Sequence, residues 1–324
     1  MVGLATCASD PLDDAISAAE DVPNLTSLSV RRDGEVLHEA YFRGTDASSP
    51  HDVRSVTKTV TALLIGDAID RGCVTSVDQP IGELLGDAAP ADSAKAAIRV
   101  RDLLTMTSGL DWVEEGSLGY NQWITSDDQV DYVLARDLVA TPGTVFNYNS
   151  GALHLLSAIL THACAPTEDF AADHLFGPLG FTAAGWEVDA QQLTNGAAGL
   201  ALTNPQLAAI GQLVLDRGAF AGAQLVSADY VDQMTTPQID TGNPLDGTPS
   251  YGFGIWLGDR EDTGRFALAE GFGGQFIAVV PAARAVVVAT TRWMDLARDG
   301  QADSDFNALY NRLVTRVLPA LIDR

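Results

Sequence analysis

Lysine is nearly absent from this chain of 324 residues, because only Lys58 and Lys95 occur. Lysine and arginine together number 19 against 43 aspartates and glutamates, which gives a formal net charge of −24. Nucleic acids and anionic membranes are bound through clustered cations, so we expect neither as a partner. So large an excess of carboxylates also repels itself at low salt. This pattern favours a halophilic protein, with an ordinary acidic soluble protein as the alternative.

Cysteine and metal-binding patterns are also scarce. Cys7, Cys73 and Cys164 are scattered, and the five histidines show no metal-ligand spacing. The chain has no Gly-x-Ser-x-Gly elbow, no His-Glu-x-x-His motif and no phosphate-binding loop. We therefore expect no disulfide framework, no metal site and no cofactor.

Membrane-spanning and export signals are missing from the sequence as well. No apolar run is long enough to cross a bilayer. Residues 1–14 lack the basic start and the long apolar stretch of a signal peptide. We expect a cytoplasmic protein, unless an export signal precedes this sequence.

Apolar periodicity predicts strands at both ends of the chain and helices between them. The helices are expected over residues 12–21, 55–70, 100–107, 127–139, 151–164, 201–218, 227–234 and 307–321, and the strands over residues 25–43, 251–257, 266–269, 276–281 and 285–290. Turns such as Arg32-Asp33-Gly34 join neighbouring strands as hairpins, so the sheet should be antiparallel.

The predicted fold class is α/β (α+β), with an antiparallel sheet built from both chain ends and flanked by helices. A mainly helical domain is inserted between the two parts of the sheet. We place the sheet domain at residues 1–60 and 200–324 and the helical domain at residues 61–199. Ser55 would then lie near the seam between the domains, where ligand pockets are common.

The clearest chemical motif is Ser55-Val56-Thr57-Lys58 at the start of an apolar helix. Ser55 and Lys58 are three residues apart, so they share a helix face. A serine hydroxyl becomes a nucleophile when a base takes its proton, and burial can lower the pKa of a lysine enough for that role. The alternative is a capping serine beside a lysine whose charge reaches solvent, but a lone lysine in an apolar helix fits that interpretation poorly.

Two further segments are candidates for the same site. Tyr148 precedes a predicted helix, and a phenol near a cation can relay protons. The glycines of Glu270–Gln275 would let backbone N–H groups approach a ligand closely. Taken alone, a packed tyrosine and a plain glycine hairpin explain these two segments as well.

Together these segments resemble the serine β-lactamase and penicillin-binding-protein superfamily, in its class C and esterase-like branch. The resemblance rests on the Ser55 motif, on Arg101–Leu110, on Tyr148 and on Gly271–Gln275. It implies that Ser55 is acylated and that Lys58 and Tyr148 share the base and acid work. It also implies an oxyanion hole made by the backbone N–H groups of Ser55 and Gly274.

Two departures separate the chain from true β-lactamases. The class C pattern Tyr-x-Asn is replaced by Tyr148-Asn149-Ser150, so Ser150 stands where an amide would contact substrate. The pattern Lys-Thr-Gly or His-x-Gly is replaced by Gly271-Phe272-Gly273, which removes the cation that would hold a β-lactam carboxylate. Both changes are similar to 6-aminohexanoate-dimer hydrolases and related esterases.

The resemblance also implies a substrate-binding set. Phe272 would line an apolar acyl pocket, and Gly273 belongs to the same oxyanion and substrate-binding set. Tyr120 and Asn121 fall roughly where this family lines its cleft, with surface-loop roles as the alternative. The expected partner is a small-molecule ester or amide, and no pattern indicates an oligomeric state.

The leading functional hypothesis is a serine hydrolase that cleaves a small ester or amide through an acyl-enzyme on Ser55. A true β-lactamase or D-alanyl-D-alanine carboxypeptidase is the first alternative. A non-catalytic sensor or scaffold on this fold is the second, because fold alone does not fix function.

Overall fold

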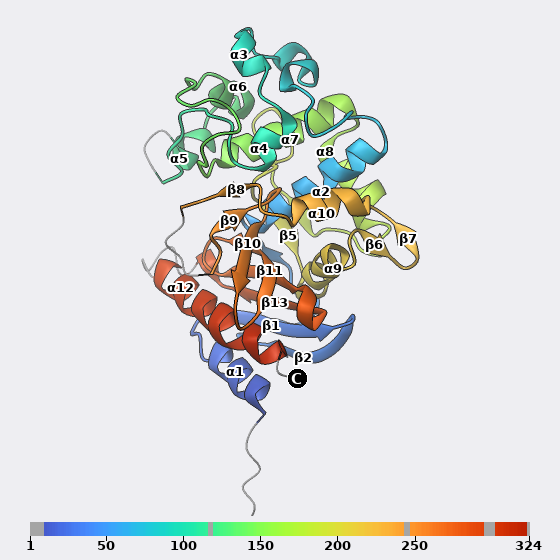
Figure 1. Ribbon diagram of the computed structural model, residues 1–324, viewed down its shortest axis with the longest axis vertical. Coiled ribbons are helices and arrows are strands. Elements are labelled where there is room, and N and C mark those ends of the chain that lie inside the picture. The colour runs from blue at the N-terminus through green and yellow to red at the C-terminus, as the bar shows by residue number, and fades with distance from the viewer. Residues whose placement is uncertain (1–9, 116–118, 243–246, 295–301, 323–324) are drawn as a thin grey trace, which may run out of the picture.

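The computed structural model describes residues 10–115, 119–242, 247–294 and 302–322. Its main element is an eight-stranded sheet in which every pairing is antiparallel. In spatial order its strands are β2 (Glu35–Tyr41), β1 (Leu25–Arg32), β13 (Ala285–Thr291), β12 (Gln275–Val280), β11 (Gly264–Gly271), β10 (Trp256–Arg260), β9 (Ser250–Tyr251) and β8 (Ile239–Asp240). Strands from both chain ends therefore meet at the pairing of β1 with β13 (Figure 1).

Helices cover both faces of this sheet. One face carries the terminal helices α1 (Pro11–Glu20), α12 (Ala302–Arg312), η5 (Leu313–Val317) and α13 (Leu318–Ile322), and the short turn η4 (Pro281–Ala283) follows β12. The opposite face carries α2 (Val56–Asp70) and α9 (Asn204–Leu215), with α10 (Ala228–Met234) packed against α2. The first and last helices of the described chain thus pack together, in the lower part of Figure 1.

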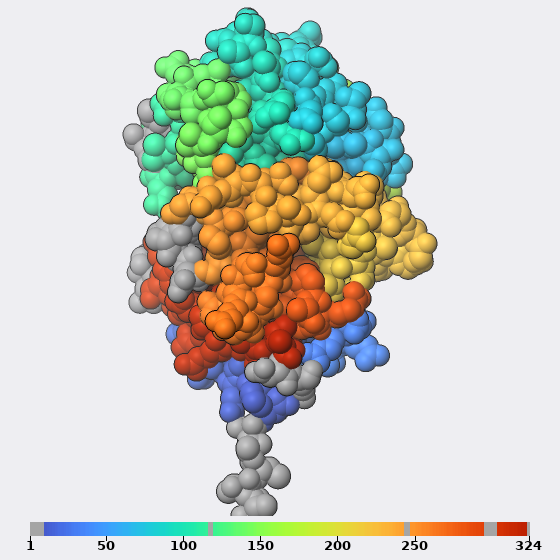
Figure 2. Space-filling view, viewed as in Figure 1, coloured from blue at the N-terminus to red at the C-terminus, as the bar shows by residue number. Residues whose placement is uncertain are grey.

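The remaining helices form the upper part of the molecule in Figures 1 and 2, where the cyan and green segments gather above the orange strands. They are η1 (Ile81–Glu83), η2 (Gly86–Ala88), α3 (Ser93–Ala96), α4 (Val100–Leu104), α5 (Tyr120–Trp123), α6 (Gln129–Leu134), α7 (Ser150–Ala163), α8 (Thr167–Ala171) and η3 (Ala172–Phe176). Two small sheets complete the fold: β3 (His51–Asp52), β5 (Leu200–Leu202) and β4 (Gly185–Trp186), and β6 (Ala219–Phe220) with β7 (Ala223–Gln224).

The period-two alternation of the strands divides the core into two layers. On β11, Ala267 and Ala269 belong to the apolar cluster that contains α2, α7 and α9. Phe266 and Leu268, one residue out of phase, belong to the cluster formed with the terminal helices. Burying both faces explains why the central strands are apolar at nearly every position.

The predicted fold class is confirmed: a mixed α/β structure with a large antiparallel sheet flanked by helices. The hairpin of β1 and β2 turns at Asp33 and Gly34, which have φ of +50° and +81° as a tight hairpin requires. The domain boundaries at residues 60 and 200 stay a prediction, since one apolar cluster extends across both.

Several predicted elements differ from the observed ones. The strand expected over residues 251–257 is broken between β9 and β10, because the Gly252 N–H turns back to the Ile255 carbonyl. Leu200–Leu202 forms β5 instead of the start of a helix, and α6 ends at Leu134. Within the described ranges, every helix is too short or too polar to cross a bilayer.

Candidate active site

The nucleophile candidate stands at the first turn of α2. Before it, the Asp52 carboxylate accepts a hydrogen bond from the Arg54 N–H (2.9 Å), and Arg54 has φ of +49°. This sharp turn places Ser55 at the N-cap position, but its hydroxyl caps no backbone N–H of the helix. The Ser55 hydroxyl is therefore available for chemistry, beside the N-terminal end of a helix dipole.

Lys58 lies one turn further along α2, and its side chain is almost completely buried. Its Nζ is 2.7 Å from Ser55 Oγ and donates to the Ala197 carbonyl at 3.0 Å. Burial lowers the pKa of Lys58 to about 7; the charge of Glu114 opposes this, and Arg54 adds a smaller lowering. A lysine with this pKa is substantially neutral near physiological pH, so it can accept the Ser55 proton.

Tyr148 completes the group from the segment that leads into α7. Its ring centroid is 5.1 Å from Lys58 Nζ, and its ring stacks on Trp256 at 5.8 Å. Burial raises the pKa of Tyr148 well above its usual range, and Glu114 adds to this, against the effect of a hydrogen bond with Ser55. Tyr148 therefore stays a phenol, which donates a proton more readily than it accepts one.

Glu114 is a component of the site that sequence reasoning missed. Its carboxylate accepts hydrogen bonds from the Trp112 indole (2.6 Å) and from the Ser150 N–H (3.0 Å). It also accepts one from the Ser150 hydroxyl. Ser150, expected to contact substrate, is thus fully buried with its hydroxyl engaged by Glu114. No local motif marks Glu114, because its partners are brought to it by the fold.

The turn between β11 and β12 approaches the start of α2 closely. A Cβ on Gly271 would lie only 2.4 Å from the Val53 carbonyl oxygen, so glycine is required there. The Gly274 N–H, expected to serve the oxyanion hole, donates instead to the Gly271 carbonyl at 3.1 Å. The expectation for Gly274 is corrected accordingly, since that N–H closes the turn. Within the described ranges, the N–H groups of Ser55 and Phe272 donate to no acceptor.

The same turn carries one carboxyl and one exposed ring. Burial raises the pKa of Glu270 to about 8, and its Oε1 has no hydrogen-bond partner among the described residues. The Phe272 side chain is 44% exposed and packs edge-on against Trp293 at 6.2 Å. Gly273 lies directly on Trp293, because an added Cβ there would be 2.5 Å from the Trp293 Cβ.

The two remaining predicted residues lie on α5. The Tyr120 hydroxyl accepts a hydrogen bond from Arg54 (3.0 Å), so Tyr120 lies beside the residue that precedes the nucleophile. Arg54 is further held by the Asp52 carboxylate at 3.4 Å and by the face of Trp293 at 4.4 Å. Asn121 is exposed on the surface.

A protein-family model matches most of the chain. The model described as Beta-lactamase covers residues 12–312. The chain belongs to the β-lactamase family. No curated protein matches the sequence.

Solved structures of the family share the fold at low sequence identity. A Bacillus anthracis protein assigned as a 6-aminohexanoate-dimer hydrolase is 18% identical, with a TM-score of 0.75 over 96% of this chain and 81% of its own. EstCE1, a hydrolase with promiscuous acyltransferase activity, is 16% identical, with a TM-score of 0.76 over 93% of this chain and 100% of its own. The octameric penicillin-binding protein homologue from Pyrococcus abyssi is 20% identical, with a TM-score of 0.69 over 94% and 75%. The predicted β-lactamase superfamily is confirmed by the family model, and its class C and esterase-like branch stays a prediction.

Proposed function

We propose that this hydrolase-family member cleaves a small ester or amide through an acyl-enzyme on Ser55. The observation that carries the proposal is the 2.7 Å contact between Ser55 Oγ and Lys58 Nζ, made by a buried lysine whose pKa is about 7. A nucleophile and its base within hydrogen-bond reach are the defining geometry of covalent catalysis.

In the acylation step, the neutral Lys58 amine takes the Ser55 proton while Oγ attacks the substrate carbonyl. The negative charge that develops on the carbonyl oxygen is received by the N–H groups of Ser55 and Phe272, which have no other described acceptor. The Tyr148 phenol donates its proton to the leaving group and regains one from the Lys58 ammonium. The bond to the leaving group breaks, and Ser55 holds the acyl group.

Deacylation reverses the proton path. A water molecule takes the place of the leaving group and loses its proton to the Tyr148–Lys58 pair as it attacks the acyl carbon. Ser55 Oγ leaves and recovers a proton from Lys58. The acid product departs, and Ser55, Lys58 and Tyr148 are back in their starting protonation states.

The turn around Glu270 and Phe272 argues against a β-lactamase. A substrate carboxylate arriving there would meet the Glu270 carboxyl and a phenyl ring instead of a lysine. Arg54, the cation beside Ser55, is already held by Asp52, Tyr120 and Trp293. An uncharged acyl group suits this surface better, and an acyl-enzyme accords with the promiscuous acyltransferase activity of EstCE1, which shares the fold.

The proposal is tested with short p-nitrophenyl esters and a chromogenic cephalosporin, assayed side by side in high salt. We expect the ester to be hydrolysed with the larger kcat/KM, and Ser55→Ala to abolish turnover while the exposed control Ser304→Ala retains it. Faster cephalosporin hydrolysis would establish the β-lactamase alternative. A folded wild-type protein inactive on the whole panel would favour the non-catalytic sensor.

A further inference from the structure

The backbone around Gly196 and Ala197 lies between the two helices that border the catalytic residues. On one side it touches α7, since a Cβ on Gly196 would be 2.5 Å from the Leu153 carbonyl oxygen. On the other side it is bound by α2: Thr61 Oγ1 donates to the Gly196 carbonyl at 2.8 Å, and Lys58 Nζ donates to the Ala197 carbonyl at 3.0 Å. The position of this backbone therefore sets where the Lys58 amine points.

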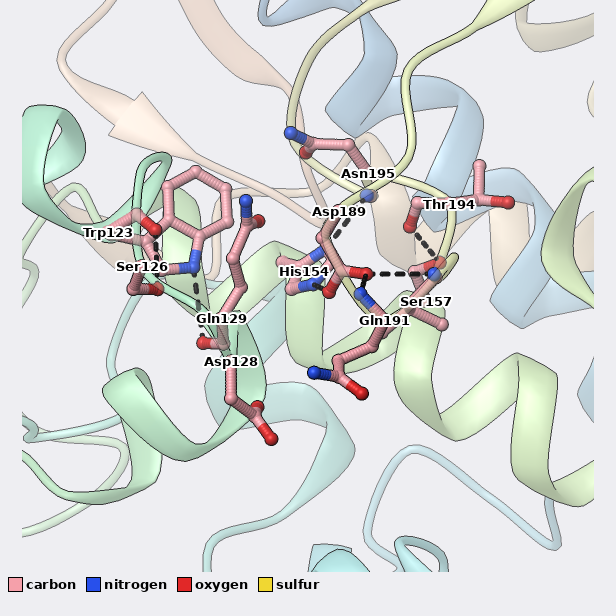
Figure 3. A network of polar contacts seen from close by, with 12 residues as sticks. Trp123, Ser126, Asp128, Gln129, His154, Ser157, Asp189, Gln191, Thr194 and Asn195 are labelled. Carbon is pink, nitrogen blue, oxygen red and sulfur yellow. Dashed lines mark hydrogen bonds and ion pairs between the residues drawn. The ribbon is translucent and has the colours of Figure 1, made fainter.

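A buried histidine holds the same backbone from α7. His154 has no exposed surface, and its Nδ1 accepts the Gly196 N–H at 3.4 Å. Its Nε2 is 3.3 Å from Asp189 Oδ2, as Figure 3 shows. Since Nδ1 faces a donor, the ring proton lies on Nε2, and it is donated to the Asp189 carboxylate.

The Asp189 carboxylate is itself fixed in place. Its Oδ1 accepts the N–H groups of Gln191 (2.8 Å) and Leu193 (2.9 Å). Burial would raise the pKa of Asp189, but hydrogen bonds from His154 and from these N–H groups outweigh it and hold the pKa below its usual value. The ionised carboxylate therefore keeps the proton of His154 on Nε2 and leaves Nδ1 free to accept.

The rest of the segment is also held by hydrogen bonds, which limit how far it can move. The Asn195 side chain accepts the N–H groups of Ala197 (2.9 Å) and Ala198 (3.1 Å). The hydroxyl of Ser157, one turn after His154 on α7, donates to the Thr194 carbonyl at 2.6 Å (Figure 3). Gly196 is the point at which the histidine acts on an otherwise constrained segment.

We propose that His154 and Asp189 are positioning residues for the general base: Asp189 fixes the His154 tautomer, His154 holds Gly196, and the adjoining Ala197 carbonyl orients the Lys58 amine toward Ser55. This inference rests on the function proposed for Ser55 and Lys58. In the neutral amine, an N–H held by Ala197 restricts rotation of the amine and directs the lone pair toward the Ser55 hydroxyl. Side chains buried away from substrate act here through hydrogen bonds to a backbone that touches the base.

Asp189→Asn tests the tautomer most sharply because it preserves shape. The asparagine oxygen can keep accepting from Gln191 and Leu193, and this leaves an NH2 group facing His154 Nε2. The ring proton must then move to Nδ1, where it meets the Gly196 N–H head-on. We expect kcat to fall about tenfold or more with KM nearly unchanged, as for a displaced catalytic group. The matched control Asp173→Asn changes an exposed carboxylate and should leave kcat unchanged.

The pH profile separates this role from a purely structural one. The Ala197 carbonyl stabilises the protonated Lys58, so its displacement should move the acidic limb of the kcat profile to lower pH. Nitrogen NMR of the imidazole should show Nε2 protonated in the wild type and Nδ1 protonated in Asp189→Asn. A loss of packing alone would lower the melting temperature without shifting the acidic limb or moving the ring proton of His154.

A pair of His154 variants keeps the test decisive if Asp189→Asn folds poorly. His154→Asn offers an oxygen near the Nδ1 position, whereas His154→Leu has similar bulk and no acceptor. We expect His154→Asn to retain several-fold more kcat than His154→Leu. Equal rates in folded variants with an unshifted pH profile would overturn the inference. Loss of activity in Ser55→Ala would still stand in that case, so the function proposed for Ser55 would be unaffected.

Discussion

At the start of α2, the polar groups of the catalytic pair have close partners within the protein: Lys58 contacts both Ser55 and the Ala197 carbonyl. At the turn between β11 and β12, the Phe272 ring is 44% exposed, and Glu270 keeps a buried oxygen unpaired among the described residues. The first region is arranged before substrate arrives, as a site for proton transfer must be. The second leaves groups open, as a surface that selects substrate would.

Lys58→Met should have the largest effect on activity, because it removes the base from the region at the start of α2. Removing the base should lower kcat/KM by about 10³-fold or more, measured with a p-nitrophenyl ester.

The same substitution should make the folded protein more stable. Between about pH 7 and the ordinary lysine value of 10.5, the unfolded chain holds the Lys58 proton and the folded chain does not, so burial of Lys58 costs stability that is recovered as pH rises. Met carries no proton, so the variant should melt at a higher temperature at pH 7, and the gain should shrink towards pH 10.5. A variant that stays active contradicts the assignment of the base.

Gly271→Ala tests whether catalysis requires the close approach of the turn between β11 and β12 to α2. The new Cβ would lie 2.4 Å from the Val53 carbonyl oxygen, so the turn must shift and carry the Phe272 N–H away from Ser55. We expect kcat/KM to fall roughly 10- to 100-fold, because small displacements of catalytic groups cost that much. Gly185→Ala, at a position with nothing within 4 Å of the added Cβ, is the control and should behave as the wild type. Equal activity of the two variants would remove the turn from the catalytic site.

The pH dependence of the wild type reports on the buried lysine directly. With the pKa of Lys58 at about 7, the free amine falls tenfold per pH unit well below that value. Activity on an ester should therefore fall with the same slope in acid and level off at mildly alkaline pH. An acidic limb with its midpoint above pH 9 would mean that burial does not lower the pKa of Lys58.

Glu270→Gln probes selection with a smaller effect. Above its pKa of about 8 the carboxyl is charged and should repel an anionic ester such as p-nitrophenyl hemisuccinate. At pH 9 the variant should gain roughly fivefold on that ester relative to a neutral ester of equal length, because removing one nearby like charge is worth about 1 kcal/mol. At pH 6 the gain should vanish, because Glu270 is then neutral. A gain that is independent of pH would indicate a steric effect.

The smallest effect concerns the whole surface. We expect the melting temperature to rise by roughly 5 °C or more between low salt and molar KCl, because salt screens the repulsion of a chain with net charge −24. Differential scanning fluorimetry across a KCl series measures it. A melting temperature that does not change with KCl would favour the alternative, an ordinary acidic protein.

The sequence was most informative where chemistry is local. Ser55 and Lys58 are three residues apart on one helix, so their contact follows from helix geometry. Tyr148 was found through its resemblance to a known motif. Glu114, Ala197 and His154 could not be predicted, because distant segments of the fold bring them to the site. Gly274 was misjudged for a related reason: which N–H a glycine turn leaves free depends on the hydrogen bond that closes it.

Covalent labelling of Ser55 decides whether this pair is catalytic. The folded protein is treated with a fluorophosphonate probe in high salt across a pH series, followed by intact-mass spectrometry and peptide mapping. We predict one adduct per chain on Ser55, formed with a rate that has its midpoint near pH 7, and no adduct in Ser55→Ala. An adduct that persists in Ser55→Ala, or a folded wild type that never reacts, would contradict the assignment.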